Sequence, residues 1–337
     1  MKVLLYFENE DSIKKSGIGR ALKHQLIACK EAGVTTTTNK NDAFDLAHIN
    51  TLWAKSEKLL KKCKKDGIPV IVHGHSTYED FRRSFTLWQL IEPWFDGRIR
   101  KMYSQADLII TPTPYSKRLI DGYGFGVKTI AISNGINLEE YKPNIEGQNK
   151  FRERFKIEEG EKFVMGVGFP FERKGIIDFF EVARRFPDTK FIWFGHLAKI
   201  LTNLKIRRAI RKRPKNVIMA GYCSGDVIHG AYDLASCMFF PSLEETEGIV
   251  VLEALASHTP LLLRDIGVYD PWLIDGINCH KAKTNDEFEA KLRDLLENGE
   301  DEAILKAGYK VAEERSLDKI GERLKAAYAS LLLEKRQ

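Results

Sequence analysis

Short apolar runs alternate with longer amphipathic stretches along the whole chain. In the first half, apolar runs of strand length cover residues 3–7, 45–50, 68–73, 107–111 and 128–132. Between these runs the apolar residues recur at helical spacing, most clearly from Arg20 to about Ala32. Such runs are typical of parallel strands that helices cover on both faces. The pattern predicts an α/β domain over residues 1–140.

The second half repeats this alternation. Apolar runs cover residues 163–168, 190–195, 216–219, 237–240 and 260–263. We expect helices between them, and a helical tail from about residue 285 onward.

A polar stretch separates the two halves at residues 141–160. It contains Pro143 and Gly147 and few large apolar residues, so we interpret it as a linker. The predicted fold is therefore α/β, with two Rossmann-like, doubly wound parallel-sheet domains at 1–140 and 161–315. A C-terminal helix at 316–337 could pack back on the N-terminal domain. Ligands of such sheets bind at the carboxyl ends of the strands, which predicts a cleft where the two domains face each other.

Composition narrows the class of protein. The chain has 337 residues and a net charge of +6, and its five cysteines show no metal-ligand spacing, so we expect reduced thiols. The apolar run at the N-terminus is too short for a signal peptide, and no stretch is long enough to span a bilayer. We therefore expect a cytoplasmic protein.

Basic residues gather between Thr189 and Gly225. This stretch holds nine lysines and arginines and no acidic residue. A patch of this kind indicates nucleotide phosphates, nucleic acid or an anionic membrane as a partner, or else a solvated basic helix.

The most specific motif runs from Pro241 to Leu255, with the sequence PSLEETEGIVVLEAL. An apolar strand ends at Pro241, and a glycine-containing loop opens a helix. The amides of Gly248 and Ile249 would lie at the helix N-terminus, where the helix dipole favours a phosphate. Glu245 falls in the loop and Glu253 in the helix; alone, such a pair could be two surface carboxylates.

This segment resembles the Glu-x7-Glu signature of the retaining glycosyltransferases of family 4, which have the GT-B fold. The resemblance implies that Glu245 lies against the hydroxyls of the donor sugar and that Glu253 binds the ribose of the nucleotide. It also implies that Gly248 and Ile249 hold the diphosphate.

A second motif, from Gly166 to Gly175, has the sequence GVGFPFERKG and is similar to the phosphate-binding segment of the same family. The leaving nucleoside diphosphate develops negative charge, which cations stabilise. The resemblance assigns this role to Lys174, with Arg173 beside it. Phe169 stands where many members have arginine, so either Arg173 supplies both contacts or the phosphate is held less symmetrically.

The N-terminal domain holds weaker matches. Gly17 and Gly19 follow the first strand and resemble the family's glycine-rich loop, which approaches the donor phosphate. The segment from His75 to Asp80 resembles one in bacterial diacylglycerol glycosyltransferases, and it implies that His75 lies near the hydroxyls of the transferred sugar. A histidine at a strand end is also often structural.

Residues 81–95 combine aromatic residues at helical spacing with Arg82 and Arg83. This pattern fits either a helix in the membrane interface or a helix facing a core; Trp88 and Trp94 favour the membrane. The basic segment at 199–215 is the other candidate for binding anionic lipid.

The resemblance is strongest to bacterial diglycosyl-diacylglycerol synthases. It implies transfer of glucose or galactose from a UDP-hexose to monoglucosyl-diacylglycerol, giving an α-1,2-linked product, by an enzyme on the inner face of the cell membrane. The sequence contains no Asp-x-Asp triplet, so we expect no metal site and no cofactor, and nucleic acid is not an expected partner. The alternatives are a family 4 enzyme with a soluble or polyprenyl-linked acceptor, and a non-catalytic basic module that binds membrane or nucleic acid.

Overall fold

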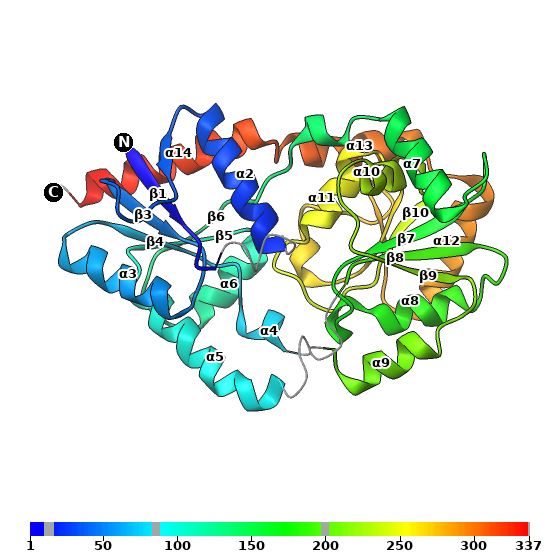
Figure 1. Cartoon of the computed structure of the whole chain (residues 1–337), viewed down its shortest axis with the longest axis horizontal. Helices are drawn as coiled ribbons and strands as arrows, with labels where there is room; N and C mark the ends of the chain where they lie inside the picture. Colours follow the sequence, from blue (N-terminus) through cyan, green and yellow to red (C-terminus); the bar gives the residue numbers. More distant parts are fainter. Residues whose placement is uncertain (10–16, 83–87, 197–201, 336–337) are drawn as a thin grey trace. The chain divides into compact units, whose positions relative to one another are not determined.

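A computed structural model describes residues 1–9, 17–82, 88–196 and 202–335. The chain divides into two compact units, and each is built on one six-stranded sheet (Figure 1). Unit 1 comprises Met1–Phe81, Gln89–Asn137 and Arg315–Gln337, and the main body of unit 2 is Leu138–Glu314. The recorded strand pairs in both sheets are parallel, which confirms the predicted α/β class.

The sheet of unit 1 has the strand order β2-β1-β3-β4-β5-β6, which is that of a doubly wound sheet. Its strands are β1 (Lys2–Tyr6), β2 (Thr35–Thr37), β3 (Leu46–Ile49), β4 (Val70–His73), β5 (Leu108–Thr111) and β6 (Thr129–Ala131). Its helices are α2 (Gly17–Glu31), α3 (Ala54–Lys65), α4 (Tyr78–Phe81), α5 (Trp88–Tyr103), α6 (Pro114–Gly122) and α14 (Leu317–Glu334).

The C-terminal helix α14 belongs to unit 1, where it lies against α2 (Figure 1). A Cβ atom on Gly321 would lie 2.1 Å from the carbonyl oxygen of Ala28, so only glycine allows the two helices to come this close. Leu317, Ile320 and Leu324 of α14 join the core of unit 1. The packing of α14 thus completes the core of the first unit.

The sheet of unit 2 has the order β12-β11-β10-β7-β8-β9. Its strands are β7 (Phe163–Val167), β8 (Lys190–Phe194), β9 (Val217–Gly221), β10 (Cys237–Phe240), β11 (Leu261–Arg264) and β12 (His280–Ala282). Its α-helices are α7 (Ile145–Phe155), α8 (Ile176–Ala183), α9 (Leu204–Arg211), α10 (Asp226–Leu234), α11 (Ile249–Ala256), α12 (Asn285–Asn298) and α13 (Glu302–Glu313). The 3-10 helices η1 (Leu138–Tyr141), η2 (Glu172–Lys174) and η4 (Gly267–Tyr269) lie in its loops.

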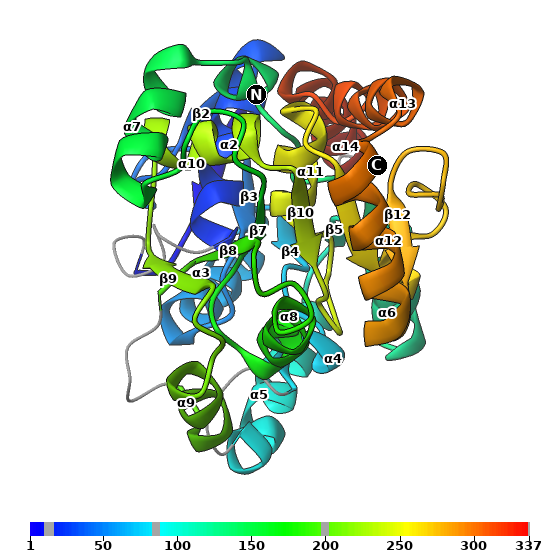
Figure 2. The ribbon, with the colours of Figure 1, turned by 90° about the vertical axis from the view of Figure 1, so that its right-hand side faces the viewer.

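Aromatic side chains fill the core on one face of this sheet. Helices α8 and α12 cover that face, and Phe179 packs between Trp193 of β8 and Phe239 of β10. Figure 2 shows α8 and α12 next to each other on this side. The other helices of the unit include the pair α7 and α10, which Figure 1 shows together.

The stretch at 141–160, interpreted as a linker, is part of unit 2. It holds helix α7, which packs closely on α10. A Cβ atom on Gly230 would lie 2.2 Å from the carbonyl oxygen of Gly147, so glycine is needed where the helices meet. Phe151 and Phe155, one helical turn apart, are buried. Two buried aromatic residues and the close approach of two glycines thus hold a helix whose other residues are mostly polar.

Candidate active site

Two loops of unit 2 meet at the carboxyl ends of the adjacent strands β7 and β10. The backbone N–H of Leu243 donates to the carbonyl of Arg173 at 2.6 Å, and the hydroxyl oxygen of Ser242 lies 3.2 Å from the same carbonyl oxygen. A Cβ atom on Gly175 would lie 2.1 Å from the carbonyl oxygen of Pro241. These contacts fix η2 against the loop after β10, so the two sequence motifs form one cluster.

A buried ion pair lies at the centre of this cluster. The Nζ atom of Lys174 lies 2.5 Å from Oε1 of Glu245, and the hydroxyl of Ser242 donates to the same oxygen at 2.6 Å. The guanidinium of Arg173 lies 3.9 Å from it and donates to the carbonyl of Glu244. Of the predicted site residues, Arg173, Lys174 and Glu245 are therefore brought together.

The charge state of Glu245 follows from these neighbours. Its burial raises the pKa of the carboxyl, but the charges of Lys174 and Arg173 and the hydrogen bonds from Lys174 and Ser242 outweigh burial and lower it. Glu245 is therefore an anion at neutral pH. A buried anion flanked by two cations can accept hydrogen bonds from hydroxyl groups, while the cations face incoming negative charge.

Helix α11 begins beside this ion pair. Gly248 precedes its first residue, Ile249, and has a φ of 84°, a left-handed conformation that suits glycine. The first N–H groups of a helix have no partner within it, and such groups can bind an anion. The hydroxyl of Tyr269 is buried without a hydrogen-bond partner among the described residues, 3.5 Å from where a Cβ atom of Gly248 would lie.

Glu253 lies within α11 and is 3% exposed. The hydroxyl of Tyr232, on α10, donates to its Oε2 atom at 2.8 Å. This bond fixes one carboxylate oxygen of Glu253.

Gly168, in the second motif, lies next to the side chain of Lys174. The chain at Gly168 has a φ of 148°, and the side chain of Lys174 passes 3.6 Å from where a Cβ atom there would lie. The indole N–H of Trp193 donates to the carbonyl of Gly168 at 2.9 Å. Phe169, which stands where many family members have arginine, packs against the ring of Phe171. It brings no charge to the cluster.

In unit 1, His75 follows strand β4. Its Nε2 atom lies 3.0 Å from Oδ1 of Asn50, which follows β3, and its ring stacks on that of His73 at 3.9 Å. Burial lowers the pKa of His75 to about 3, so the ring is neutral at pH 7. Gly17 and Gly19 lie in the first turn of α2, while Ser16 of the same motif lies outside the described residues.

Comparison with known proteins identifies the family. The model for glycosyl transferases group 1 matches residues 147–311, and the model for glycosyltransferase family 4 matches residues 36–140. The processive diacylglycerol alpha-glucosyltransferase of Acholeplasma laidlawii is 50% identical over 338 residues, which cover 100% of both chains. This chain is a family 4 glycosyltransferase.

Other comparisons agree with this family. The alpha-galactosylglucosyldiacylglycerol synthase of Streptococcus pneumoniae is 30% identical over 257 residues, 74% of this chain and 66% of the relative. A crystal structure of the Anabaena protein HepE in complex with UDP-glucose matches with a TM-score of 0.77 at 16% identity, covering 98% of this chain and 100% of the other. The last match shows that the glycosyltransferase shares the GT-B fold.

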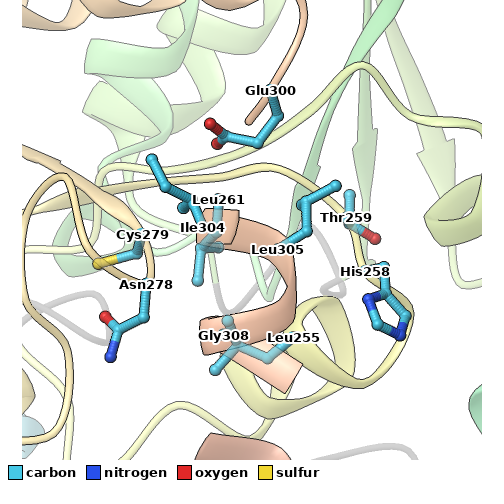
Figure 3. A pocket seen from close by; sticks show the side chains of 10 residues that line it. All are labelled: Leu255, His258, Thr259, Leu261, Asn278, Cys279, Glu300, Ile304, Leu305 and Gly308. Atoms are coloured by element: carbon cyan, nitrogen blue, oxygen red, sulfur yellow. The ribbon is translucent and has the colours of Figure 1, made fainter. Parts of the chain in front are cut away.

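One pocket of the glycosyltransferase lies away from this cluster. Leu255 of α11, Ile304, Leu305 and Gly308 of α13 and the segment at 258–261 line it, together with Asn278, Cys279 and Glu300 (Figure 3). Its free volume is about 10 Å³, which is room for about one water molecule. Neither Lys174 nor Glu245 lines it, so it is not the candidate site.

The segments predicted to bind membrane are only partly described. Residues 83–87 and 197–201 lie outside the described residues, so the structure says nothing about the membrane roles predicted for them. Phe81 stacks on Phe95 at 4.0 Å and both are buried, so these two aromatic residues face the core of unit 1. Leu90, Ile91 and Trp94 on α5 are exposed. The ring of Trp94 stacks on that of Trp53, which is also exposed.

These four side chains, Trp53, Leu90, Ile91 and Trp94, form what we call the α5 patch.

None of the helices within the described ranges is long and apolar enough to cross a membrane. On α9, which has no acidic residue in its first turn, Lys205 pairs with Glu172 at 2.6 Å.

Some residues of the site were not predicted. Ser242 and Tyr232 orient the two motif glutamates, and Asn50 contacts His75. Ser242 could have been found, because it lies three residues before Glu245 in the strongest motif. Tyr232 and Asn50 could not, since both lie on other elements and only the fold brings them close.

Proposed function

We propose that this glycosyltransferase transfers a hexose from a UDP-sugar to monoglucosyl-diacylglycerol with retention at the anomeric carbon. The product would be an α-1,2-linked dihexosyl-diacylglycerol. The observation that carries the acceptor class is the identity of 50% over 338 residues with a diacylglycerol glucosyltransferase.

The donor half of the proposal rests on the unit 2 cluster. The diphosphate would lie between the first amides of α11 and the cations Lys174 and Arg173, and Glu253 would accept hydrogen bonds from the ribose. Glu245 would accept hydrogen bonds from the hydroxyls of the donor hexose. The neutral ring of His75, in unit 1, would contact another hydroxyl of that sugar. We propose that these groups hold the diphosphate without a metal ion.

The main requirement of the proposed transfer is to stabilise the negative charge that develops on the leaving diphosphate. As the bond from the anomeric carbon to the phosphate oxygen breaks, the electron pair stays on the β-phosphate, where Lys174 and Arg173 stabilise it. The acceptor hydroxyl attacks the anomeric carbon from the same face and passes its proton to the leaving phosphate. No separate protein base is required in this scheme.

The names of the relatives are compatible with two donors, UDP-glucose and UDP-galactose. The relative from A. laidlawii is a glucosyltransferase, and the relative from S. pneumoniae is an alpha-galactosylglucosyldiacylglycerol synthase. The first is the more similar and spans the whole chain, which favours UDP-glucose. A glycolipid acceptor would place the enzyme at a membrane surface, and the α5 patch would supply exposed apolar side chains for peripheral binding to the inner face.

The test is a matrix of donors and acceptors with the purified full-length chain. UDP-glucose and UDP-galactose are each assayed against diacylglycerol, monoglucosyl-diacylglycerol and a soluble glucoside, with the lipids in anionic vesicles. We expect the fastest transfer from UDP-glucose to monoglucosyl-diacylglycerol, with retention of activity in EDTA. Equal transfer to the soluble glucoside would contradict the lipid acceptor. Absence of both transfer and donor hydrolysis would contradict the whole proposal.

A further inference from the structure

Polar side chains in unit 1 form a continuous hydrogen-bonded chain at the carboxyl ends of β3 and β4. From His75, the chain passes to Oδ1 of Asn50 at 3.0 Å and on to Nε2 of Gln25 at 2.8 Å. That nitrogen lies 3.1 Å from Nδ1 of His73, which in turn lies 3.1 Å from Nε2 of His48. The last four side chains are each at most 3% exposed. Because these polar side chains are shielded from water, they must form hydrogen bonds with one another, and the position of each proton therefore depends on its neighbours.

The three imidazoles of this chain are neutral. Burial lowers the pKa of both His48 and His75 to about 3, and it lowers that of His73 well below its usual range. A neutral imidazole has one N–H donor and one acceptor nitrogen, so the tautomer of each ring depends on its neighbours.

Two arrangements of protons fit the contacts along this chain, and in both the Nε2 atom of His73 is buried without a hydrogen-bond partner among the described residues. In the first, all three histidines carry the proton on Nε2: His75 donates to Oδ1 of Asn50, and His48 donates to Nδ1 of His73. In the second, both side-chain amides are turned over and all three histidines carry the proton on Nδ1. The tautomers are thus coupled, and one fixed group decides between the two arrangements.

The carbonyl group of His48 is that fixed group. The Nδ2 atom of Asn50 donates to it at 3.4 Å, and a carbonyl oxygen can only accept. Turning the amide over would set Oδ1 of Asn50 against this oxygen. Tyr328, at the far end, agrees with the first arrangement, because its hydroxyl can donate to Nδ1 of His48 at 2.9 Å. In the second arrangement that hydroxyl would have to donate to the sulfur of Cys29 at 4.0 Å, a weaker bond.

We propose that Asn50 is a positioning residue that holds His75 as the Nε2–H tautomer and leaves its Nδ1 atom as a hydrogen-bond acceptor for a substrate hydroxyl. His75 is partly exposed, and no described residue forms a hydrogen bond with this nitrogen. A neutral acceptor binds the hydrogen of a hydroxyl and repels a carboxylate or phosphate oxygen. This consequence for binding rests on the role proposed for His75, whereas the tautomer itself does not.

The first measurement uses the wild-type chain without ligand. Long-range ¹H–¹⁵N correlation spectra distinguish the two neutral tautomers and the imidazolium, and His75→Gln identifies the signals of His75. We expect the Nε2–H pattern for His75, His73 and His48 together at pH 7. The Nδ1–H pattern, or a protonated ring, at His75 would overturn the proposal.

Two variants then test the role of Asn50. Asn50→Leu removes the acceptor, and we expect the signals of His75 to shift to a mixture of tautomers. Asn50→Asp keeps an acceptor oxygen, so we expect the Nε2 atom of His75 to stay protonated. His280, which pairs with Glu300 in unit 2, is the internal control and its signals should not move. A fixed Nε2–H pattern in folded Asn50→Leu would overturn the role of Asn50.

Addition of UDP-glucose separates this inference from the proposed function. Binding of a sugar hydroxyl should shift the Nδ1 resonance of wild-type His75, and in transfer assays Asn50→Leu should lose about tenfold, the ratio for one hydrogen bond of about 1.4 kcal/mol. If the tautomer is as proposed but UDP-glucose leaves the Nδ1 resonance in place, the role of His75 as an acceptor for this sugar is overturned, while its positioning by Asn50 stands.

Discussion

Lys174 and Glu245 are held against each other, with Nζ 2.5 Å from Oε1, by loops that follow two adjacent strands. Each is assigned to a different part of the donor: the lysine to the diphosphate and the glutamate to the hexose. Without donor, the two charges neutralise each other within a buried site. A diphosphate bound as proposed would therefore share the lysine with the glutamate.

If Lys174 is shared between Glu245 and the diphosphate, one substitution should have opposite effects on UDP binding and on turnover. In Glu245→Gln the carboxylate no longer competes for Lys174, so UDP should bind up to about tenfold more tightly, a gain of about 1.4 kcal/mol. Turnover with UDP-glucose should fall by about a hundredfold or more, because the charge at the sugar is lost. Calorimetric titration with UDP and initial rates measure the two effects.

The control for this experiment is Glu172→Gln. Glu172 pairs with the exposed Lys205, so its loss should change neither quantity by more than about twofold. Weaker UDP binding in Glu245→Gln would show that Glu245 supports the diphosphate site rather than competing with it.

Lys174→Ala should reduce turnover by two to three orders of magnitude, the usual effect of removing one group that stabilises transition-state charge. The side chain of Lys174 is 15% exposed and lies over the ring of Phe240, so water cannot easily replace it. Lys205→Ala removes a lysine that is 63% exposed, and we expect a rate near that of the wild type. A rate for Lys174→Ala within tenfold of the wild type would contradict the assignment.

All the inner strands were predicted, and two of the four edge strands were missed. The predicted apolar runs correspond to the inner strands, such as β4 and β10, which are buried along their whole length, and to the edge strands β6 and β9. Both missed strands lie at sheet edges: β2 consists of three threonines and β12 of His-Lys-Ala. An edge strand has a neighbour on one side only, so it does not need a continuous apolar run.

The site shows the same limit. The resemblance of two motifs to those of the family predicts Glu245, Lys174 and Arg173, and the structure brings these three side chains together. Asn50 and Tyr232 orient the predicted residues from other elements, and their sequence neighbourhoods carry no sign of this. Helix α7 was missed because only Phe151 and Phe155 mark its buried face, and the stretch around them is polar.

Gly175 should be essential to the phosphate loop for two separate reasons. Its φ of 69° disfavours other residues, and a Cβ atom would lie 2.1 Å from the carbonyl oxygen of Pro241. Gly160 has a φ of 77° but nothing within 4 Å, so Gly160→Ala isolates the backbone effect of about 1–2 kcal/mol. Gly175→Ala should lose about 1–3 kcal/mol more from the clash and should also lose activity. Chemical denaturation measures both; equal losses would contradict the clash.

Binding to membranes should depend on the α5 patch. Leu90 is 75% exposed and Trp94 is 53% exposed, and both lie on α5. The double change Leu90→Glu with Trp94→Glu should weaken sedimentation with anionic vesicles by about tenfold or more, as expected when buried apolar area is replaced by charge. Leu333→Glu changes an apolar residue of α14 that is 62% exposed and should bind as the wild type does. Equal losses in both variants would indicate a general effect of negative charge.

Acid stability should depend on Glu57, which joins α3 to α5. Hydrogen bonds from Lys101 and Lys61, together with the ion pair to Arg98, lower the pKa of Glu57 from 4.5 to about 2 despite a small opposing effect of burial. Between these two pH values the unfolded chain binds a proton at this residue and the folded chain does not, so folding becomes more favourable as pH rises. The contribution is complete above pH 4.5 and is lost as pH falls toward 2.

Glu57→Gln lacks this contribution at every pH. The gap between its urea midpoint and that of the wild type should therefore be widest at pH 6 and narrow steadily as the pH falls from 4.5 toward 2. Glu139→Gln removes a carboxylate from an exposed pair with Lys142, and its midpoint should follow that of the wild type throughout. A gap that stays constant over this range would mean that Glu57 stabilises unit 1 by packing and not by its charge.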